Sequence, residues 1–572
     1  MTAQIIENAL PTAPVDVWVD HTLSAVRKFL KSAVVIDNQP YVPQPLHTAP
    51  PSTFSTSSTI DSGMGDDFEE LLAPSPEENT LSDDVLAHIL DVRKVSDAFA
   101  GNGMACAFVL PDDGDPDVIS IERRVLGAAK ISDIVVIDWY LRDNVPVLTL
   151  ELLEKIALDD VRESGRMRLI CVYTGQPLDA QIFTDVKAAI AKGGILLDDI
   201  PNNPYCAKNS SCVVVLLNKT EVPPSELSTT LIKHFALFAE GLLPSFALAA
   251  VGAIRKNIHH MVTRFGSDLD SSYVANRLIT NPPEDVAELI RELLVAECDN
   301  ALGIESIADQ YLDKTAIEAW ISKNENFFVE QPYGKNLSVD ANLCSLLLNN
   351  GIDNTGAKNG TKKTIEFPVK HRNKVSIALA GSEVKSKQSE AAFSKLVVFK
   401  REAFGDTKLI GGDGWRPSLT TGTLVRMQEG EAKRYFVCLT PACDTLRLSD
   451  ETPFVFLEAA IDDQCYSVIL REENGEDRGL YFRGKHPTLM TYKFLPDEKS
   501  QRIRGELHDT EHGKPFFIFS ASASSGSQRF TWLGEIRYAR AASEMAKLAG
   551  NWMRIGISDS EYLRLIEAGK FK

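Results

Sequence analysis

The sequence lacks closely spaced cysteine pairs and a secretory signal. Its nine cysteines include no Cys-x-x-Cys pair, and residues 1–14 do not have the charged and apolar segments of a signal peptide. Several cysteines fall inside apolar stretches that are predicted to be buried strands. Cysteines scattered in this way are typical of a reducing compartment. We therefore expect a cytoplasmic protein.

An uninterrupted apolar run of the length of a membrane span is also missing. The nearest candidate is the stretch 235–254, which has about the twenty residues that a spanning helix needs. Glu240 and Pro244 interrupt it, and two shorter buried helices explain the same composition. We expect no contact with a membrane.

Basic residues are too few and too dispersed for a general nucleic-acid binder. The formal net charge is -19, and residues 1–360 carry 27 Lys and Arg against 51 Asp and Glu. Residues 361–572 carry 33 against 28, so this part is only weakly basic. Phosphate neutralisation needs clustered Lys and Arg, and no helix-turn-helix with a basic recognition helix is visible. Nucleic acid is therefore not an expected partner.

With 572 residues, the chain is too long for one hydrophobic core. The spacing of apolar residues changes along the chain and divides it into four parts. These are an N-terminal helix within 1–32, an α/β domain at 33–224, a helical region at 225–350 and a β-rich domain at 360–572 that ends in helices. Within the α/β domain, residues 40–81 are rich in Pro, Ser, Thr, Asp and Glu. They have too little apolar surface to order, so we predict a disordered insertion there.

The α/β domain is predicted from apolar runs that alternate with helical patterns. Each run is short and apolar on both faces, which is what a central parallel strand requires. The five predicted strands are 33–38, 105–110, 134–138, 169–174 and 212–217. Residues 194–211, between the last two, are predicted to form a turn-rich loop. Strands separated by helices indicate a doubly wound βαβ fold with a parallel sheet.

Four strand ends carry polar residues of particular kinds. Asp37 and Asn38 lie at the end of the first strand, Asp138 at the end of the third and Thr174 at the end of the fourth, and Lys219 follows the fifth. The carboxyl ends of parallel strands meet at one edge of a sheet, so these side chains should share a pocket. The set suits phosphoryl transfer to Asp138 as the nucleophile. Oxygens of Asp37, Asn38 and Asp138 would hold a divalent cation, while Lys219 and the Thr174 hydroxyl would contact the phosphoryl group.

With these residues, the stretch 33–224 resembles the receiver domain of bacterial two-component response regulators. The segment 134–141, with Asp138 at its centre, is similar to the phosphoacceptor segment of that family, and Thr174 and Lys219 follow in the expected order. The resemblance implies a flavodoxin-like fold, Mg²⁺ as cofactor, a histidine kinase as partner and the backbone carbonyl of Tyr140 as a further metal contact. Asn38 departs from the family, because receivers usually have an acid there.

The first functional hypothesis is a response regulator that accepts a phosphoryl group on Asp138 and signals through contacts with other proteins, such as a downstream effector. Its catalysis would be limited to self-phosphotransfer and autodephosphorylation, so it is not expected to be a conventional enzyme. The overall layout also resembles regulators of bacterial defence gene clusters, such as the response-regulator component of the defensive two-component (Detocs) anti-phage system.

Two alternatives remain open on the sequence. One is a pseudo-receiver that acts as a docking protein without phosphorylation, which Asn38 favours. The other is a hydrolase built around Cys443 and Asp444 in the turn at 440–444. The stimulus, the cognate kinase, the oligomeric state and the ligand of 360–572 do not follow from the sequence.

Overall fold

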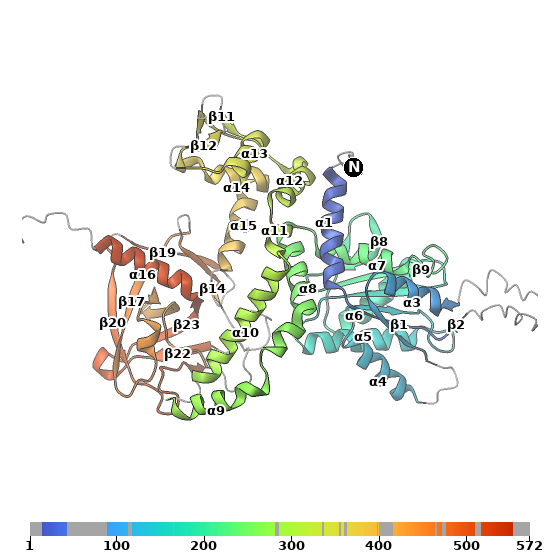
Figure 1. Cartoon of the computed structure of the whole chain (residues 1–572), viewed down its shortest axis with the longest axis horizontal. Helices are drawn as coiled ribbons and strands as arrows, with labels where there is room; N and C mark the ends of the chain where they lie inside the picture. Colours follow the sequence, from blue (N-terminus) through green and yellow to red (C-terminus); the bar gives the residue numbers. More distant parts are fainter. Residues whose placement is uncertain are drawn as a thin grey trace, which may run out of the picture. The chain divides into compact units, whose positions relative to one another are not determined.

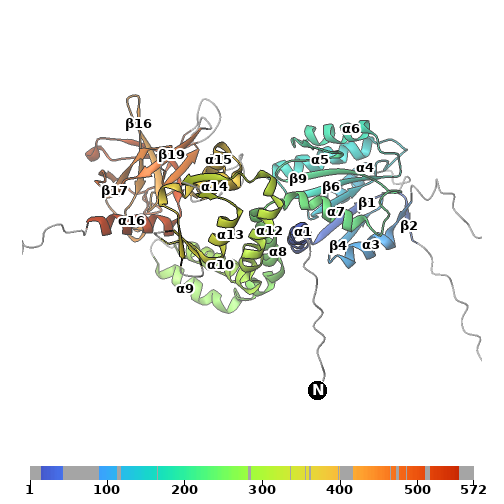
Figure 2. The same ribbon diagram turned by 90° about the horizontal axis from the view of Figure 1, so that it is seen from above.

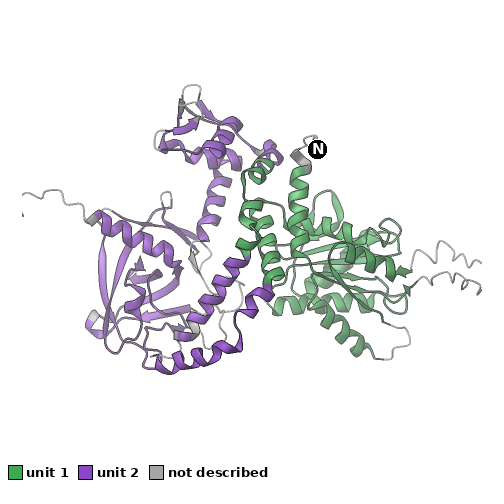
Figure 3. Cartoon of the chain, viewed as in Figure 1, with its two compact units in different colours: residues 1–257, 302–320 green, residues 258–301, 321–572 purple. Residues whose placement is uncertain are grey.

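The computed structural model describes most of the chain as two compact units (Figures 1 and 3). Unit 1 comprises residues 1–257 and 302–320, and unit 2 comprises 258–301 and 321–572. The residues that the structure describes are 14–42, 89–111, 117–163, 165–280, 285–334, 337–353, 356–359, 363–396, 398–399, 416–463, 466–471, 476–484, 486–508 and 516–552.

Unit 1 is built on a seven-stranded sheet whose order is β4-β1-β5-β6-β9-β8-β7. The first five strands are parallel. They are β4 (Ala105–Val109), β1 (Ser32–Ile36), β5 (Ile134–Ile137), β6 (Arg168–Thr174) and β9 (Cys212–Asn218). In chain order, the first strand lies between the second and the third, as in flavodoxin-like folds. The predicted fold class is therefore confirmed.

Helices cover both faces of this sheet (Figure 2). One face packs against α1 (Pro14–Phe29), α3 (Val92–Gly101) and α7 (Leu227–Phe235). The other face packs against α4 (Val118–Ala129), α5 (Val147–Arg162) and α6 (Ala180–Lys192). Successive residues of β1 point to opposite faces, so Val35 belongs to the first core and Val34 to the second. The apolar runs are buried on both sides, which explains why they show no alternation.

Residues 194–211 differ from the prediction of a loop. They form an antiparallel hairpin of β7 (Asp198–Ile200) and β8 (Asn203–Lys208), which extends the sheet beyond β9. The side chains of β7 are mostly exposed, so the strand does not need apolar residues and its sequence shows no apolar pattern. At the predicted insertion, β2 (Pro40–Tyr41) pairs with β3 (Leu90–Asp91), while residues 43–81 of that insertion lie outside the described residues.

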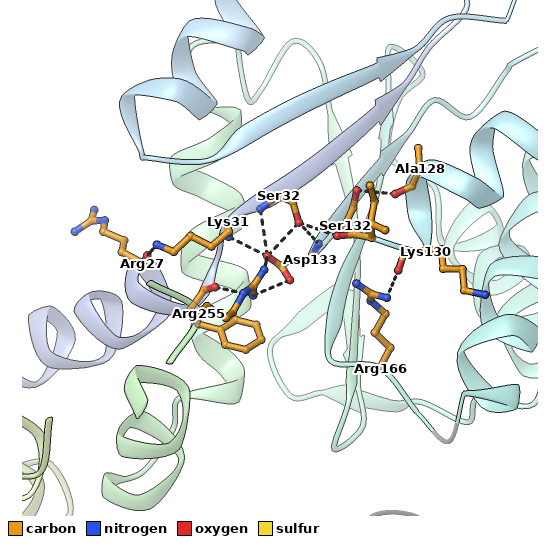
Figure 4. Close-up of polar contacts among 11 residues, drawn as sticks. Arg27, Lys31, Ser32, Ala128, Lys130, Ser132, Asp133, Arg166 and Arg255 are labelled. Atoms are coloured by element: carbon orange, nitrogen blue, oxygen red, sulfur yellow. Dashed lines mark hydrogen bonds and ion pairs between the residues drawn. The ribbon is translucent and has the colours of Figure 1, made fainter. Parts of the chain in front are cut away.

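A further layer of helices completes unit 1. It includes η1 (Ala236–Phe238), the first sixteen residues of α8 (Leu242–Thr263) and α11 (Ile307–Tyr311). Arg255 of α8 forms two hydrogen bonds of 3.1 Å with the Asp133 carboxylate, and Asp133 also accepts backbone N–H groups of Lys31 and Ser32 (Figure 4). None of the helices in the described part of the chain is long and apolar enough to cross a membrane.

Unit 2 begins with helices and continues with strands. Its helices are η2 (Ser267–Leu269), α9 (Asp270–Ile279), α10 (Asp285–Ile304, shared with unit 1), α12 (Lys314–Lys323, shared with unit 1), η3 (Glu325–Phe327), α13 (Ala341–Asn350), η4 (Val369–His371), α14 (Asn373–Ala380), α15 (Glu383–Lys395), η7 (Ala442–Thr445), η8 (Ala523–Ser525) and α16 (Tyr538–Trp552). Two small hairpins precede the main sheet, β10 (Gln331–Gly334) with β11 (Leu337–Val339) and β12 (Gly356–Asn359) with β13 (Lys363–Glu366).

A ten-stranded sheet forms the centre of unit 2. Its strands are β14 (Val398–Phe399), β15 (Thr423–Glu429), β16 (Ala432–Cys438), β17 (Thr452–Ile461), β18 (Val468–Arg471), β19 (Asp477–Phe482), β20 (Leu489–Phe494), β21 (Glu506–His508), β22 (Phe516–Ser520) and β23 (Arg529–Ile536). It contributes to two apolar clusters, one of them rich in phenylalanine. Of the helices predicted at the end of this domain, α16 is present and follows β23 directly. Residues 553–572 lie outside the described residues.

Candidate functional site

Asp138 follows directly on β5, at the carboxyl edge of the parallel sheet. Its backbone N–H donates to the carbonyl of Ile36 (2.9 Å), which extends the β1–β5 ladder by one residue. The backbone carbonyl of Asp138 accepts the hydroxyl of Thr149, a fully buried residue of α5 (3.0 Å). Asp138 itself is only 8 % exposed. The strand and the helix that follows it therefore both fix the main chain of this residue.

Lys219 joins Asp138 to Asp37. Its Nζ lies 2.7 Å from Asp37 Oδ2 and 2.9 Å from Asp138 Oδ1, and all three residues are buried. The remaining carboxylate oxygens accept backbone N–H groups, Asp37 Oδ1 from Gln39 (2.8 Å) and Asp138 Oδ2 from Tyr140 (2.9 Å). Residues separated by 182 positions in the sequence thus meet around one ammonium group.

The electrostatics of this cluster reflect its burial. Burial raises the pKa of the Asp138 carboxyl; Asp37 acts in the same direction, while Lys219 lowers it. Burial lowers the pKa of the Lys219 ammonium, but the two carboxylates together outweigh it, so that the pKa of Lys219 is raised overall. Lys219 therefore stays charged. Burial destabilises the ionised form of Asp138, and the ion pair with Lys219 offsets part of this effect.

Thr174 ends β6 and is almost fully buried. Its Cα partner across the ladder is Asn218, and its carbonyl accepts the backbone N–H of Lys219 (2.8 Å). The Thr174 hydroxyl oxygen accepts the N–H of Gln176 (3.0 Å), which leaves the hydroxyl proton for another acceptor. The structure therefore brings Asp37, Asp138, Thr174 and Lys219 to one edge of the sheet.

Asn38 and Tyr140, the other two predicted metal contacts, are half-buried neighbours of Asp37 and Asp138 in the chain. Two carboxylates, one amide oxygen and one backbone carbonyl make a set of hard oxygen donors, which is what Mg²⁺ prefers. Two carboxylates already flank a single positive charge, and the oxygens that accept one N–H each retain further lone pairs. These residues fit a Mg²⁺ site. Within the described residues no three His, Cys, Asp or Glu side chains form a metal-binding cluster, in keeping with an amide at position 38.

Asn218 was not singled out on the sequence. Its side chain is buried and joins two loops at the carboxyl edge, through Gln176 on one side and Thr220 on the other. Its only signal in the sequence is its position next to Lys219, and nothing in that position reveals a contact 42 residues away.

The surroundings of Cys443 do not favour a reactive thiolate. It is exposed, in the short helix η7, and its Sγ donates to the Asp444 carboxylate at 3.3 Å. This hydrogen bond raises the pKa of the Cys443 thiol, so the thiolate is disfavoured. An activated nucleophile needs the opposite shift, and the hydrolase hypothesis therefore gains no support.

Comparison with known proteins finds one match, in the part of the chain that holds these residues. Residues 29–224 match the family model of the response receiver domain. No curated protein and no solved structure matches the chain. The match supports a receiver domain in this part of the chain and, with it, a response regulator of a two-component system that interacts with a histidine kinase.

Proposed function

We propose that the chain is a response regulator that is phosphorylated on Asp138 by a histidine kinase. The observation that carries this proposal is the meeting of Asp37, Asp138 and Lys219 at the carboxyl edge of the sheet, with Nζ of Lys219 within 2.9 Å of both carboxylates. Thr174 lies beside them on the next strand. A structural ion pair needs one acid and one base, whereas a second buried acid beside the same lysine adds a desolvation cost that is typical of functional sites.

The proposed reaction transfers one phosphoryl group. A carboxylate oxygen of Asp138 attacks phosphorus, a P–O bond forms, and the P–N bond to the histidine of the kinase breaks. The electron pair of that bond returns to the imidazole nitrogen, and Asp138 becomes an acyl phosphate. Lys219 and the Thr174 hydroxyl supply a positive charge and a donor for the phosphoryl oxygens.

The proposed cation would be held by Asp37, Asn38, Asp138 and the carbonyl of Tyr140. When bound, Mg²⁺ neutralises the negative charge of the phosphoryl group as it approaches two carboxylates. Phosphorylation replaces the single carboxylate charge of Asp138 with a dianionic phosphoryl group, a net gain of about one negative charge at this edge. The positions of Thr174 and Lys219 would respond to these charges, and a downstream effector would bind the altered surface.

The test is incubation of the full chain with acetyl phosphate and Mg²⁺, followed by intact mass measurement. We expect one added phosphoryl group on the wild type and none on Asp138→Asn. The phosphoryl group should be lost in hydroxylamine, which cleaves acyl phosphates. An unlabelled wild type, or equal labelling of Asp138→Asn, would contradict the proposal.

Asn38→Asp is a second variant for the same assay. It adds a third carboxylate to the proposed metal ligands, and affinity for a hard cation rises with the number of charged ligands. We therefore expect labelling at lower Mg²⁺ concentration than in the wild type. The docking hypothesis, in which Asp138 is never phosphorylated, rests on Asn38 alone. The meeting of Asp138, Thr174 and Lys219 at one edge of the sheet argues against it.

A role in anti-phage defence is the part of the proposal that rests on the layout of the sequence alone. The test is the efficiency of phage plating on bacteria that carry the gene with its neighbours, wild type against Asp138→Asn. Equal plating with and without the intact gene would remove this role and leave the phosphoryl transfer untouched.

A further inference from the structure

Asn218 lies between the two side chains that the proposed reaction uses to contact phosphate. It is the last residue of β9, its Cα partner in the ladder is Thr174, and the next residue in the chain is Lys219. Its exposed fraction is 6 %. An amide is costly to bury unless its donor and its acceptor are both satisfied, so the partners of this side chain are informative.

Both ends of the amide are satisfied by loops of the site. Nδ2 donates to the backbone carbonyl of Gln176 at 2.7 Å. Oδ1 accepts the backbone N–H of Thr220 at 2.7 Å and also the Thr220 hydroxyl. Gln176 is two residues after Thr174, and Thr220 directly follows Lys219. One side chain therefore joins the loop after β6 to the loop after β9.

The same two loops determine where Thr174 and Lys219 point. The N–H of Gln176 donates to the Thr174 hydroxyl oxygen (3.0 Å), so the position of Gln176 sets the orientation of that hydroxyl. The N–H of Lys219 donates to the Thr174 carbonyl (2.8 Å), which ties the two residues together at the backbone. A side chain without both a donor and an acceptor would leave at least one loop without this connection.

We propose that Asn218 is a positioning residue, which holds Thr174 and Lys219 in the geometry that phosphoryl transfer to Asp138 requires. This inference rests on the proposed function. Asn218 acts through its two neighbours and does not touch the phosphoryl group. Within the described residues the Asn218 side chain makes no hydrogen bond to Asp37, Asn38, Asp138 or Tyr140, so its influence on the proposed metal ligands passes only through Lys219.

The experiment compares Asn218→Ala with Asn209→Ala in the full chain. Asn209 precedes the other end of β9 and makes a similar set of bonds, because its Oδ1 accepts N–H groups of Ser211 (2.9 Å) and Cys212 (2.7 Å) and its Nδ2 donates to the Leu196 carbonyl (3.0 Å). It lies at the edge of the sheet away from Asp138. Both variants lose a loop connection, and only one of them loses it at the site.

Three quantities are measured, namely the labelling rate with acetyl phosphate and Mg²⁺, the affinity for beryllofluoride in the presence of Mg²⁺, and the affinity for Mg²⁺ alone by calorimetry. For Asn218→Ala we expect labelling to slow by about tenfold to a hundredfold, the usual effect of small misplacement of catalytic groups. Beryllofluoride should bind more weakly, while the Mg²⁺ affinity should change by a smaller factor, because Asn218 itself bonds none of the proposed metal ligands. Asn209→Ala should lower the melting temperature and leave all three quantities as in the wild type.

The inference is overturned if Asn218→Ala is labelled at the wild-type rate, if Asn209→Ala is slowed equally, or if Mg²⁺ affinity falls by as large a factor as the rate. If Asn218→Ala does not fold, Asn218→Ser takes its place, since a serine hydroxyl can accept the Thr220 N–H and is too short to reach Gln176. It should be labelled more slowly than the wild type, and a wild-type rate overturns the inference.

A wild type that takes no label removes the proposed function and this inference with it, whereas a labelled wild type with an unaffected Asn218→Ala removes the inference alone.

Discussion

Asp138 is both the residue on which the proposed chemistry depends and a carboxylate in an unfavourable place for folding. It is buried, it lies near Asp37 across one ammonium group, and its pKa is raised above the ordinary 3.8, chiefly by burial. Lys219 offsets part of this effect. Strained or poorly solvated charges of this kind are common at functional sites, where reactivity is retained at the expense of stability.

The raised pKa predicts a pH-dependent gain in stability for Asp138→Asn. Between pH 3.8 and the higher folded-state pKa, the folded protein binds more protons than the unfolded chain. The contribution of Asp138 to stability is therefore lost as pH rises through this window. Asparagine has the same shape and no charge, so at pH 7.5 without Mg²⁺ we expect unit 1 of the variant to melt a few degrees above the wild type, as about 1 kcal/mol would produce.

The measurement is thermal unfolding of both proteins in a series of buffers. The difference should shrink as the pH is lowered toward 4, where Asp138 becomes protonated in the wild type. A variant that melts below the wild type at pH 7.5 would show that the ion pair with Lys219 outweighs the burial of the charge.

At the scale of elements, α8 is held against the C-terminal end of α1 by a close approach and against the start of β5 by a charged contact. A Cβ on Gly252 of α8 would lie 2.5 Å from the Lys28 carbonyl oxygen, so only glycine permits this distance. One turn further on, Arg255 donates to Asp133 and to the carbonyl of Phe29 (Figure 4). Asp133 precedes β5 at the end opposite to Asp138. Helix α8 is therefore fixed to the start of the strand that ends at Asp138.

We predict opposite effects for the same substitution in two helices. Gly252→Ala forces α8 away from backbone atoms that cannot yield easily, and it should lower the free energy of unfolding of unit 1 by about 1–3 kcal/mol. Gly127→Ala, in α4, meets no atom within 4 Å. It should raise the free energy of unfolding by up to about 1 kcal/mol, because alanine is the better helix former. Urea unfolding of the full chain followed by circular dichroism measures both, and equal effects of the two substitutions would refute the close approach.

At the scale of the whole molecule, each unit has its own hydrophobic cores. The clusters of unit 1 lie on the two faces of the parallel sheet, and those of unit 2 involve the ten-stranded sheet and a small cluster around Leu343 and Phe367. Units with separate cores can unfold separately. The proposed site belongs entirely to unit 1, so its ligands should stabilise that unit.

Calorimetry of the full chain should therefore show two unfolding transitions. Beryllofluoride with Mg²⁺ at about one hundred times its dissociation constant should stabilise unit 1 by about 2.7 kcal/mol, and it should leave the other transition in place. Asp138→Asn should abolish the shift. One transition for the whole chain, or a shift of both, would mean that the two units unfold as one body.

The sequence by itself determined the parallel sheet and the edge at which its polar residues gather. Runs such as Val34 to Ile36 and Ile134 to Ile137 are apolar on both faces, and only a sheet covered by helices on both sides buries such runs. Because parallel strands end at one edge, the polar residues that follow them could be assigned to one pocket in advance.

Tertiary structure alone decided the contacts within that pocket and the elements without an apolar pattern. The double ion pair of Lys219 joins Asp37 and Asp138, and the amide of Asn218 joins two loops, but such distances depend on register and packing, which no local pattern encodes. The hairpin at 198–208 was missed because an edge strand exposes polar side chains such as Asp198 and Asp199. Local sequence specifies what must be buried, whereas the positions of polar groups relative to one another follow from how the buried parts fit together.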